Sequence, residues 1–343
     1  MIAKVRWAAA LGGAMVTVCA IAVAGGSTTL HTIESEPVAG NMMGITSLRP
    51  LFVYTPEGYE GSRRRYHVIY WIPGWKIPAT SEYVSALDAS IGGGWIPPFI
   101  AVTIDVREGV LMLNSPVFGN WADFLTQEVV PFIDGEYRTI PSPSGRALMG
   151  HSTGGYAAML LPLLYPGIWS AVGLNDASVW PACPWMEQMK VIDEFSEYTS
   201  LSSYAQACTQ VATAPNMESP RFFDFPVPDA AGTKARAAWE SRCLSNVDML
   251  RAPLDALEQI SVIGIVLPNA RLGTNRKHNL LMTTAMRQVR VVLQLVNVRG
   301  THGSHRPERF LILAGIVTSV MKGPSLDTWE SQTVAWGALK DAR

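Results

Sequence analysis

The sequence carries almost no net charge. Lysine and arginine together number 27 and aspartate and glutamate 28, which gives a formal charge of −1 at pH 7, and charged residues make up only 16% of the chain. The longest basic run is the three-residue segment Arg63–Arg65. Proteins that follow a phosphate backbone need larger clusters of cations. The composition therefore excludes nucleic acid as a partner.

Cysteine is also scarce, with four residues in 343. The first of them, Cys19, lies in a segment that has a short basic start, then an apolar stretch, and then the small residues Ala22-Val23-Ala24. This order is typical of a secretory signal peptide that is cut after Ala24. We expect residues 1–24 to be removed and the mature protein to be secreted or periplasmic. Attachment to a membrane would follow only if the segment, which is barely long enough to span a bilayer, stayed uncleaved.

The three remaining cysteines, Cys183, Cys208 and Cys243, all lie in one region of the chain. In an oxidising compartment the simplest arrangement is one disulfide and one free thiol, and the sequence does not choose the pair. Their region, from Val179 to about Leu257, is rich in Trp, Pro, Ser and Ala and has no clear strand pattern. We interpret it as a cap inserted into a larger domain.

Outside this region, apolar strands alternate with helical patterns. Hydrophobic residues make up 48% of the chain, which is ample for a large core. The predicted strands are Leu51–Thr55, His67–Ile72, Phe99–Ile104, Arg146–Gly150, Ser170–Asn175, Ile260–Leu267 and Arg290–Asn297. The predicted helices are Trp121–Glu136, Thr153–Tyr165, His278–Gln288 and Pro307–Met321.

Several of the predicted strands are unbroken apolar runs, which is typical of a sheet covered on both faces. Strands and helices that alternate in this way predict an α/β fold with a mostly parallel central sheet and helices on both faces. We assign this domain to residues 25–322, interrupted by the cap at about 179–257, and the last residues, 323–343, to a C-terminal tail. Pro162 should kink or end the helix in which it lies.

The sequence GHSTGG, residues 150–155, joins the strand Arg146–Gly150 to a helix. A Gly-x-Ser-x-Gly motif between a strand and a helix predicts a nucleophile elbow, in which a strained serine stands between two small neighbours. The helix that follows directs backbone N–H groups at charge developing near the serine. Ser152 is therefore the predicted nucleophile.

With this motif in place, the chain resembles the putative esterase family of α/β-hydrolases, which includes S-formylglutathione hydrolase, enterochelin esterases and mycolyltransferases. The other matching stretches are LFVYTPEGYEGSRRRYHVIYWIPGW, LNSPVFGNWADFLTQEVVPFIDGEYRTI and GSHRPERF. The resemblance covers roughly Leu51 to Met321 without the cap. It implies an α/β-hydrolase fold and a serine ester hydrolase that acts on a small-molecule ester and needs no cofactor.

A serine nucleophile needs a base, usually histidine, and two of the six histidines follow the last predicted strand, where this fold places its base. The family has Gly-Gly-His before a helix with an aromatic residue, and Gly303-Ser304-His305 before Phe310 resembles that pattern. We therefore favour His305 as the base and keep His302 as the second candidate. The two histidines could instead bind a metal, but Glu308 is the only carboxylate close by, so no metal site is predicted.

Two backbone N–H groups should stabilise the oxyanion. Hydrolases of this fold use the N–H of the residue after the nucleophile, here Thr153, and one from the loop after an earlier strand. That loop reads Pro73-Gly74-Trp75 in this chain, where relatives often have His-Gly. We assign the second donor to Trp75.

The catalytic acid is where this sequence departs from the family. The acid normally follows the strand before the last one, but here that strand runs into PNARLGTNRKHN, which has Asn269 or Arg271 in place of a carboxylate. Asp176, at the end of the strand after the nucleophile helix, is the candidate acid, as in pancreatic-type lipases. Asp176 could instead only cap the turn that follows it. The site would then be a Ser-His dyad, or it would take its acid from the cap (Asp224 or Asp248).

The leading hypothesis is an exported carboxylic ester hydrolase that forms an acyl-enzyme and releases it to water. An acyltransferase that passes the acyl group to an alcohol or a sugar is the second hypothesis. A binding protein that has lost activity is the third, and only the missing acid after Leu267 favours it.

Overall fold

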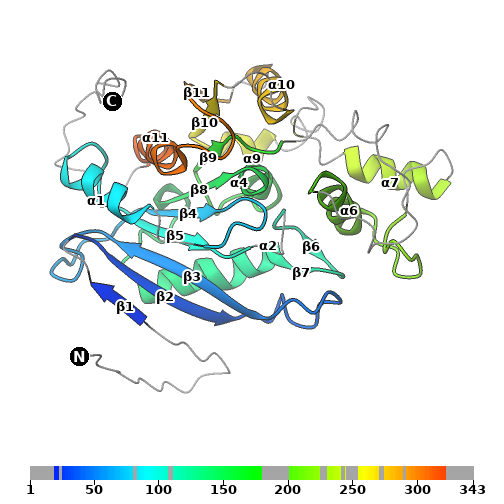
Figure 1. The fold of residues 1–343 in the computed structure, drawn as a ribbon, viewed down its shortest axis with the longest axis horizontal. Coiled ribbons are helices and arrows are strands. Elements are labelled where there is room, and N and C mark those ends of the chain that lie inside the picture. Colours follow the sequence, from blue (N-terminus) through cyan, green and yellow to red (C-terminus); the bar gives the residue numbers. More distant parts are fainter. Residues whose placement is uncertain are drawn as a thin grey trace.

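The computed structural model describes residues 19–22, 25–79, 83–106, 111–179, 201–224, 230–240, 244, 254–269, 274–288 and 291–321. Its centre is a nine-stranded sheet with the strand order β1-β2-β3-β5-β4-β8-β9-β10-β11 (Figure 1). These strands are β1 (Cys19–Ala22), β2 (Ser27–Glu34), β3 (Leu48–Thr55), β4 (Val68–Ile72), β5 (Ile100–Ile104), β8 (Arg146–His151), β9 (Ala171–Asn175), β10 (Val262–Pro268) and β11 (Leu293–Val298). A separate pair is formed by β6 (Asn114–Ser115) and β7 (Gly119–Asn120).

The sheet is parallel from β5 through β11 and antiparallel at its other edge, where β1, β2 and β3 lie. All seven predicted strands are present, so the predicted α/β class with a mostly parallel sheet is confirmed. The four strands that were not predicted are β1, β2, β6 and β7. Of these, β2 has the sequence STTLHTIE, which contains too few apolar residues to be recognised as a buried strand, although its three threonines are β-branched and favour strands.

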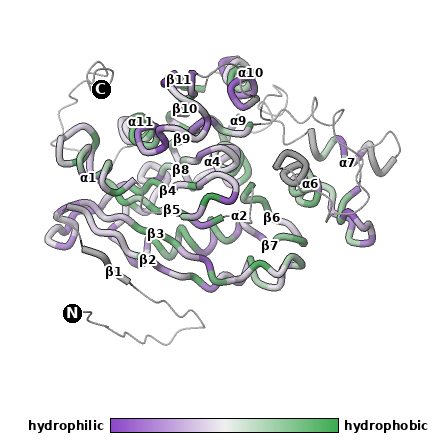
Figure 2. Tube along the Cα trace, in the orientation of Figure 1, coloured by the Kyte–Doolittle hydropathy of each residue, from purple (hydrophilic) through white to green (hydrophobic). Residues whose placement is uncertain are grey.

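The middle strands are buried on both faces, as their unbroken apolar sequences predict. In β4, every residue is buried. Successive side chains of a strand point to opposite faces, and so Val68, Tyr70 and Ile72 pack in one hydrophobic cluster while Ile69 and Trp71 pack in another. Figure 2 shows the hydrophobic residues concentrated along these strands and hydrophilic residues more frequent on the outer α10.

Helices cover the two faces of the sheet (Figure 1). They are α1 (Val84–Gly92), α2 (Trp121–Asp123), the π-helical η1 (Phe124–Val129), α3 (Val130–Glu136), the short 3₁₀ turn η2 (Pro143–Gly145), α4 (Thr153–Leu164), α6 (Leu201–Thr213), α7 (Ala230–Glu240), α9 (Leu254–Glu258), α10 (Thr274–Gln288) and α11 (Arg306–Thr318). Residues of α1 and α11 form the cluster on one face, and residues of η1, α3, α4, α9 and α10 pack in the cluster on the other.

The four predicted helices are also found, with small differences at their ends. The predicted helix Trp121–Glu136 is interrupted by the π-helical η1. Helix α4 contains Pro162 and ends two residues later, at Leu164. Helix α1 was not predicted.

The region predicted as a cap contains α6, α7 and α9 between β9 and β10 in its described part, with one isolated bridge between Pro215 and Phe223. Helix α6 lies next to β6. Cys208, in α6, is a buried free thiol, and burial raises its pKa. Cys183 and Cys243 lie outside the described residues. The predicted disulfide is therefore not formed by Cys208 in this structure.

The structure describes only a small part of the predicted signal peptide and none of the predicted tail. Of the predicted signal peptide, the structure describes β1 alone, which pairs antiparallel with β2. The predicted tail, 323–343, lies outside the described residues. Within the ranges that the structure describes, no helix is long and apolar enough to cross a membrane.

One buried ion pair joins three segments near the carboxyl end of the sheet. Arg49 of β3 donates to Asp105, just after β5, with 3.1 Å between Nη2 and Oδ1. The guanidinium also lies 4.8 Å from the centre of the Trp121 ring. The other carboxylate oxygen of Asp105 accepts the backbone N–H of Ala79, at the end of the loop after β4. Both charged side chains are almost fully buried.

Arg49→Met should destabilise the protein by about 3–5 kcal/mol, because it removes one partner of a buried ion pair and leaves the Asp105 charge uncompensated. The free energy of unfolding in urea measures this loss. Arg63→Met is the matched control, since Arg63 is exposed, and it should change stability by no more than about 0.5 kcal/mol. A loss below about 1 kcal/mol for Arg49→Met would contradict the prediction.

Candidate active site

Ser152 stands between β8 and α4 in a strained backbone conformation. Its φ is 55° and its ψ is −120°, values that a residue with a side chain rarely adopts. A Cβ on Gly154 would overlap the carbonyl oxygens of Ile72 and Pro73, and one on Gly150 would overlap the carbonyl of Gly154. The two glycines of GHSTGG are thus required by packing, and the predicted strand-turn-helix setting is present.

Two segments that carry the predicted oxyanion donors lie beside Ser152. Thr153 is the first residue of α4, and the first N–H groups of a helix have no carbonyl one turn earlier to bond with. On the other side lies the loop after β4, because a Cβ on Gly74 would be 3.1 Å from the Cβ of Ser152. Trp75, the predicted second donor, follows Gly74 in this loop. The loop is tight, since the N–H of Ile77 donates to the carbonyl of Gly74.

His302 is the histidine that contacts Ser152. Its Nε2 lies 3.0 Å from Ser152 Oγ, and its Nδ1 lies 2.7 Å from Asp176 Oδ2. Carboxylate, imidazole and hydroxyl therefore form a continuous chain of hydrogen bonds. About half of the His302 side chain is exposed, whereas that of Asp176 is buried.

The structure does not bring His305, the histidine favoured from the sequence, to Ser152. His305 is the N-cap of α11, with φ 54° and ψ 38°. Its side chain is mostly exposed and lies 3.9 Å from Glu308, one helical turn away. The preference for His305 rested on a Gly-x-His sequence that occurs twice in this loop, at Gly300–His302 and at Gly303–His305, and the contact with Ser152 is made by the other histidine. Only the histidine of the first sequence, His302, lies against the elbow.

Arg309 of α11 holds the loop that carries His302. This arginine is fully buried, and its guanidinium donates to the carbonyl oxygens of Thr301 and His302 and to the hydroxyl of Ser304. Thr301 and Ser304 close the turn themselves, since the N–H of each bonds to the other residue. Sequence reasoning missed this role for Arg309, which lies seven residues beyond the histidine.

Asp176 lies where the sequence predicted a carboxylate, directly after β9. Its backbone N–H donates to the carbonyl of Val266 in β10, and its φ of 41° directs the side chain toward the histidine loop. Oδ1 of Asp176 has no hydrogen-bond partner among the described residues. Burial lowers the pKa of Arg309, and the nearby charges of Asp176 and Glu308 act in the opposite direction.

The remaining positions considered for the acid lie elsewhere or outside the described residues. The backbone N–H of Asn269 donates to Val298. Asp224 accepts a hydrogen bond from Asn216 of the same segment. Arg271 and Asp248 lie outside the described residues.

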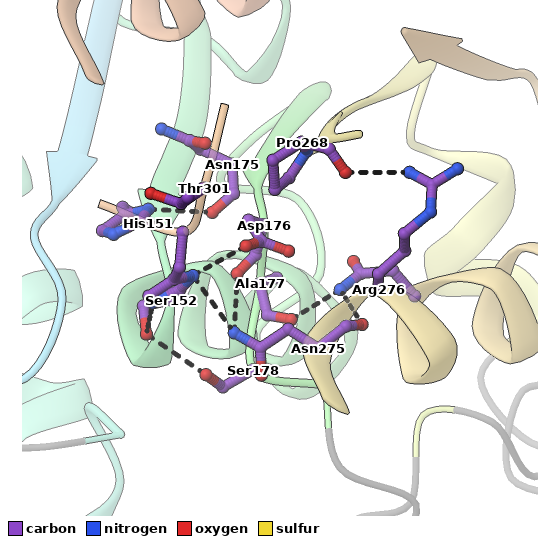
Figure 3. A network of polar contacts seen from close by, with 12 residues as sticks. His151, Ser152, Asn175, Asp176, Ala177, Ser178, Pro268, Asn275, Arg276 and Thr301 are labelled. Carbon is purple, nitrogen blue, oxygen red and sulfur yellow. Dashed lines mark hydrogen bonds and ion pairs between the residues drawn. The ribbon is translucent and has the colours of Figure 1, made fainter. Parts of the chain in front are cut away.

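Two asparagines of α10 hold the segment that begins with Asp176, and Figure 3 shows one of them, Asn275, beside that segment. Asn275 Nδ2 donates to the carbonyl of Asp176, and Asn279 Nδ2 donates to the carbonyl of Ala177 at 2.6 Å. Asn275 also lies 3.4 Å from Nδ1 of His302. Helix α10 therefore fixes the backbone of the carboxylate, a role that its sequence did not suggest.

Ser178 also contacts the elbow and was not a candidate from the sequence. Its backbone N–H donates to the carbonyl of Ser152 at 2.8 Å. Its hydroxyl lies 3.2 Å from Ser152 Oγ (Figure 3). Both serine side chains are buried.

His151 stacks on His302. The ring centres are 4.6 Å apart and the planes differ by 29°. The Nδ1 of His151 bonds to the carbonyl of Asn175 at 3.1 Å. Burial, assisted by the positive charges that His302, Arg306 and Arg309 can present, lowers the pKa of His151 to about 3. His151 is therefore neutral at ordinary pH and does not repel an imidazolium at His302.

No group of three or more His, Cys, Asp or Glu in the described ranges could hold a metal ion. The chemistry that the arrangement can support is proton transfer between Ser152 and His302 and attack by the serine oxygen on an electrophilic carbon.

Comparisons with known proteins identify the family and the fold of the chain. A family model described as "Putative esterase" matches residues 45–266, well over half of the chain. An endo-1,4-beta-xylanase/feruloyl esterase of Xylanibacter ruminicola is 32% identical over 145 residues. That match covers 37% of this chain and 19% of the relative, so the chain corresponds to about a fifth of that protein's length.

Solved structures share the fold over almost the whole chain. A ferulic acid esterase is similar with a TM-score of 0.62 and 16% identity, over 87% of this chain and 99% of that one. An S-formylglutathione hydrolase from Agrobacterium tumefaciens has a TM-score of 0.57 and 14% identity, over 89% and 99%. A fluorophosphonate-binding serine hydrolase from Staphylococcus aureus has a TM-score of 0.57 and 13% identity, over 87% and 99%. The predicted α/β-hydrolase fold is confirmed.

The depressed pKa of His151 should make the protein less stable as the pH falls below 6.5. The unfolded chain takes up a proton at His151 near the ordinary pKa of 6.5, while the folded protein does so only near pH 3, so acid favours unfolding throughout this window. Between pH 7 and pH 5 the wild type should lose about 2 kcal/mol more stability than His151→Phe. Urea unfolding at both pH values measures this difference, and equal losses would contradict the prediction.

Proposed function

We propose that this chain, which belongs to the putative esterase family, is an exported serine carboxylic ester hydrolase. It cleaves its substrate through an acyl-enzyme on Ser152, and water releases the acyl group. The chain of hydrogen bonds from Asp176 through His302 to Ser152 is the observation that carries this proposal. In this chain we propose Ser152 as nucleophile, His302 as general base and Asp176 as acid.

In the first half of the proposed reaction, Ser152 Oγ attacks the ester carbonyl carbon while its proton passes to Nε2 of His302. The π electrons of the carbonyl move onto its oxygen. When this intermediate collapses, the bond to the alcohol oxygen breaks and His302 returns the proton to that oxygen. The buried carboxylate of Asp176 keeps the other ring nitrogen protonated and stabilises the imidazolium.

The negative oxygen of the intermediate needs donors that are already in place. We propose the N–H groups of Thr153 and Trp75 for this role. The position of Thr153 at the N-terminus of α4 supports the first assignment. The proximity of Gly74 to Ser152 supports the second.

In the second half, water attacks the acyl carbon and gives its proton to His302. The bond to Ser152 Oγ breaks, and the proton on His302 restores the hydroxyl. Among the three hydrogen-bonded residues Ser152, His302 and Asp176, His302 has the partly exposed side chain, so water has access to it. The stacked His151 stays neutral through both halves and adds no charge beside the imidazolium.

The substrate class that we propose is an ester of an aromatic acid. Two of the similar proteins are named as esterases of ferulic acid, which makes a feruloyl ester the first substrate to test. The N-terminal sequence supports the proposed export, and we propose that residues 179–257 form a cap.

Ser152→Ala should abolish hydrolysis of p-nitrophenyl acetate and of methyl ferulate, because it removes the hydroxyl that lies 3.0 Å from Nε2 of His302. The purified mature protein is assayed with both esters and labelled with a fluorophosphonate. The variant should keep the wild-type melting temperature, since the hydroxyl supplies little packing. Hydrolysis or labelling that survives the substitution would contradict the proposed nucleophile.

His302→Ala should lower kcat by roughly 10³-fold or more, because base and nucleophile act as a unit. Asp176→Asn should lower it by up to about 10⁴-fold, because the amide can hold the imidazole in the wrong tautomer. His305→Ala is the matched control from the same loop and should leave kcat within about threefold of the wild type. A larger loss for His305→Ala than for His302→Ala would reassign the base.

A further inference from the structure

We propose that Ser178 is a further catalytic residue, whose hydroxyl donates a hydrogen bond to Ser152 Oγ and stabilises that oxygen when the acyl-enzyme breaks down. The inference rests on the proposed function, because it assigns a role within the same reaction. Ser178 touches the reacting atom directly, since the two hydroxyl oxygens are 3.2 Å apart.

The direction of the hydrogen bond between Ser178 and Ser152 follows from the protons that Asp176, His302 and Ser152 carry. An ionised carboxylate only accepts, so Asp176 takes the N–H of His302 Nδ1. In the neutral ring, Nε2 then carries no proton and accepts the single proton of Ser152. Ser152 has none left to give, and so the contact between the two serines has Ser178 as donor.

The backbone keeps Ser178 in this place. Its N–H is bonded to the carbonyl of Ser152, and the carbonyl of the preceding residue, Ala177, accepts from Asn279. A Cβ on Gly155 would overlap the side chain of Ala177, so α4 and this segment are in close contact. The backbone of Ser178 is thus held beside the nucleophile by one main-chain hydrogen bond, by the side chain of Asn279 and by packing. Ser178 is 3% exposed as a residue, which leaves solvent little opportunity to replace its hydroxyl.

The donor matters most when Ser152 Oγ is the leaving group. In deacylation the bond between the acyl carbon and Oγ breaks, Oγ keeps the electron pair, and the proton on His302 Nε2 moves to it. A hydrogen bond from Ser178 stabilises the charge that develops on Oγ, and Ser178 itself transfers no proton. During acylation the same bond stabilises the attacking oxygen but also makes it less nucleophilic, so its two effects oppose each other.

Ser178→Thr and Ser178→Val test the proposal, because the two side chains have nearly the same shape and only threonine keeps the hydroxyl. Turnover of p-nitrophenyl acetate is followed in the steady state and by stopped flow, with active sites counted by fluorophosphonate labelling. The valine variant should lose about 10- to 100-fold in kcat relative to the threonine variant, the range for loss of a hydrogen bond to a charged group. Its kcat/KM should change by less than about threefold, and its burst should approach one p-nitrophenolate per active site.

Ser178→Ala, which needs no added space, should behave like the valine variant. Ser170→Ala is the matched control, because Ser170 is a buried serine at the opposite end of β9, and it should keep wild-type kcat. Equal kcat values for the Ser178→Thr and Ser178→Val variants would overturn the proposal. So would a loss in kcat/KM as large as the loss in kcat for the Ser178→Val and Ser178→Ala variants. If wild-type hydrolysis also persists in Ser152→Ala, the proposed function itself fails, and this separates the two failures.

Discussion

The backbone of Ser152 is the constraint on which the site depends. A positive φ is unfavourable for a residue with a side chain, so the sheet and α4 must hold Ser152 in this conformation. They do so because Gly150 and Gly154 let β8, α4 and the end of β4 approach until their main chains touch. The same close approach puts the first turn of α4 and the Gly74 loop on either side of the serine, so that the strain and the proposed oxyanion donors have one structural origin.

A second set of contacts extends from this constraint to the rest of the proposed machinery. The carbonyl of Ser152 accepts the N–H of Ser178, and the segment from Asp176 to Ser178 is held from the other side by α10. His302 lies on a separate turn, which the buried Arg309 holds through hydrogen bonds to its carbonyl oxygens. Serine and carboxylate are thus part of the sheet, whereas the position of the imidazole depends on a loop and on one arginine.

The sequence predicted the parts that depend on local pattern. The seven strands were evident because a sheet covered on both faces needs unbroken apolar runs, and Asp176 was found because a strand end fixes where a carboxylate can lie. The sequence favoured His305 over His302, although both follow a Gly-x pair, because the position of this loop depends on Arg309, several residues away in α11. Ser178 and the asparagines of α10 were missed because their contacts join segments that are distant along the chain.

The carboxylate at the end of β9 also has a consequence for how such a site can form and change. Ser152 and Asp176 are 24 residues apart (176 minus 152) and are joined by a single β-α-β unit, β8-α4-β9. Closing so short a loop costs little chain entropy, so two of the three proposed catalytic groups are brought together within one local unit, and the C-terminal segment supplies the third, His302.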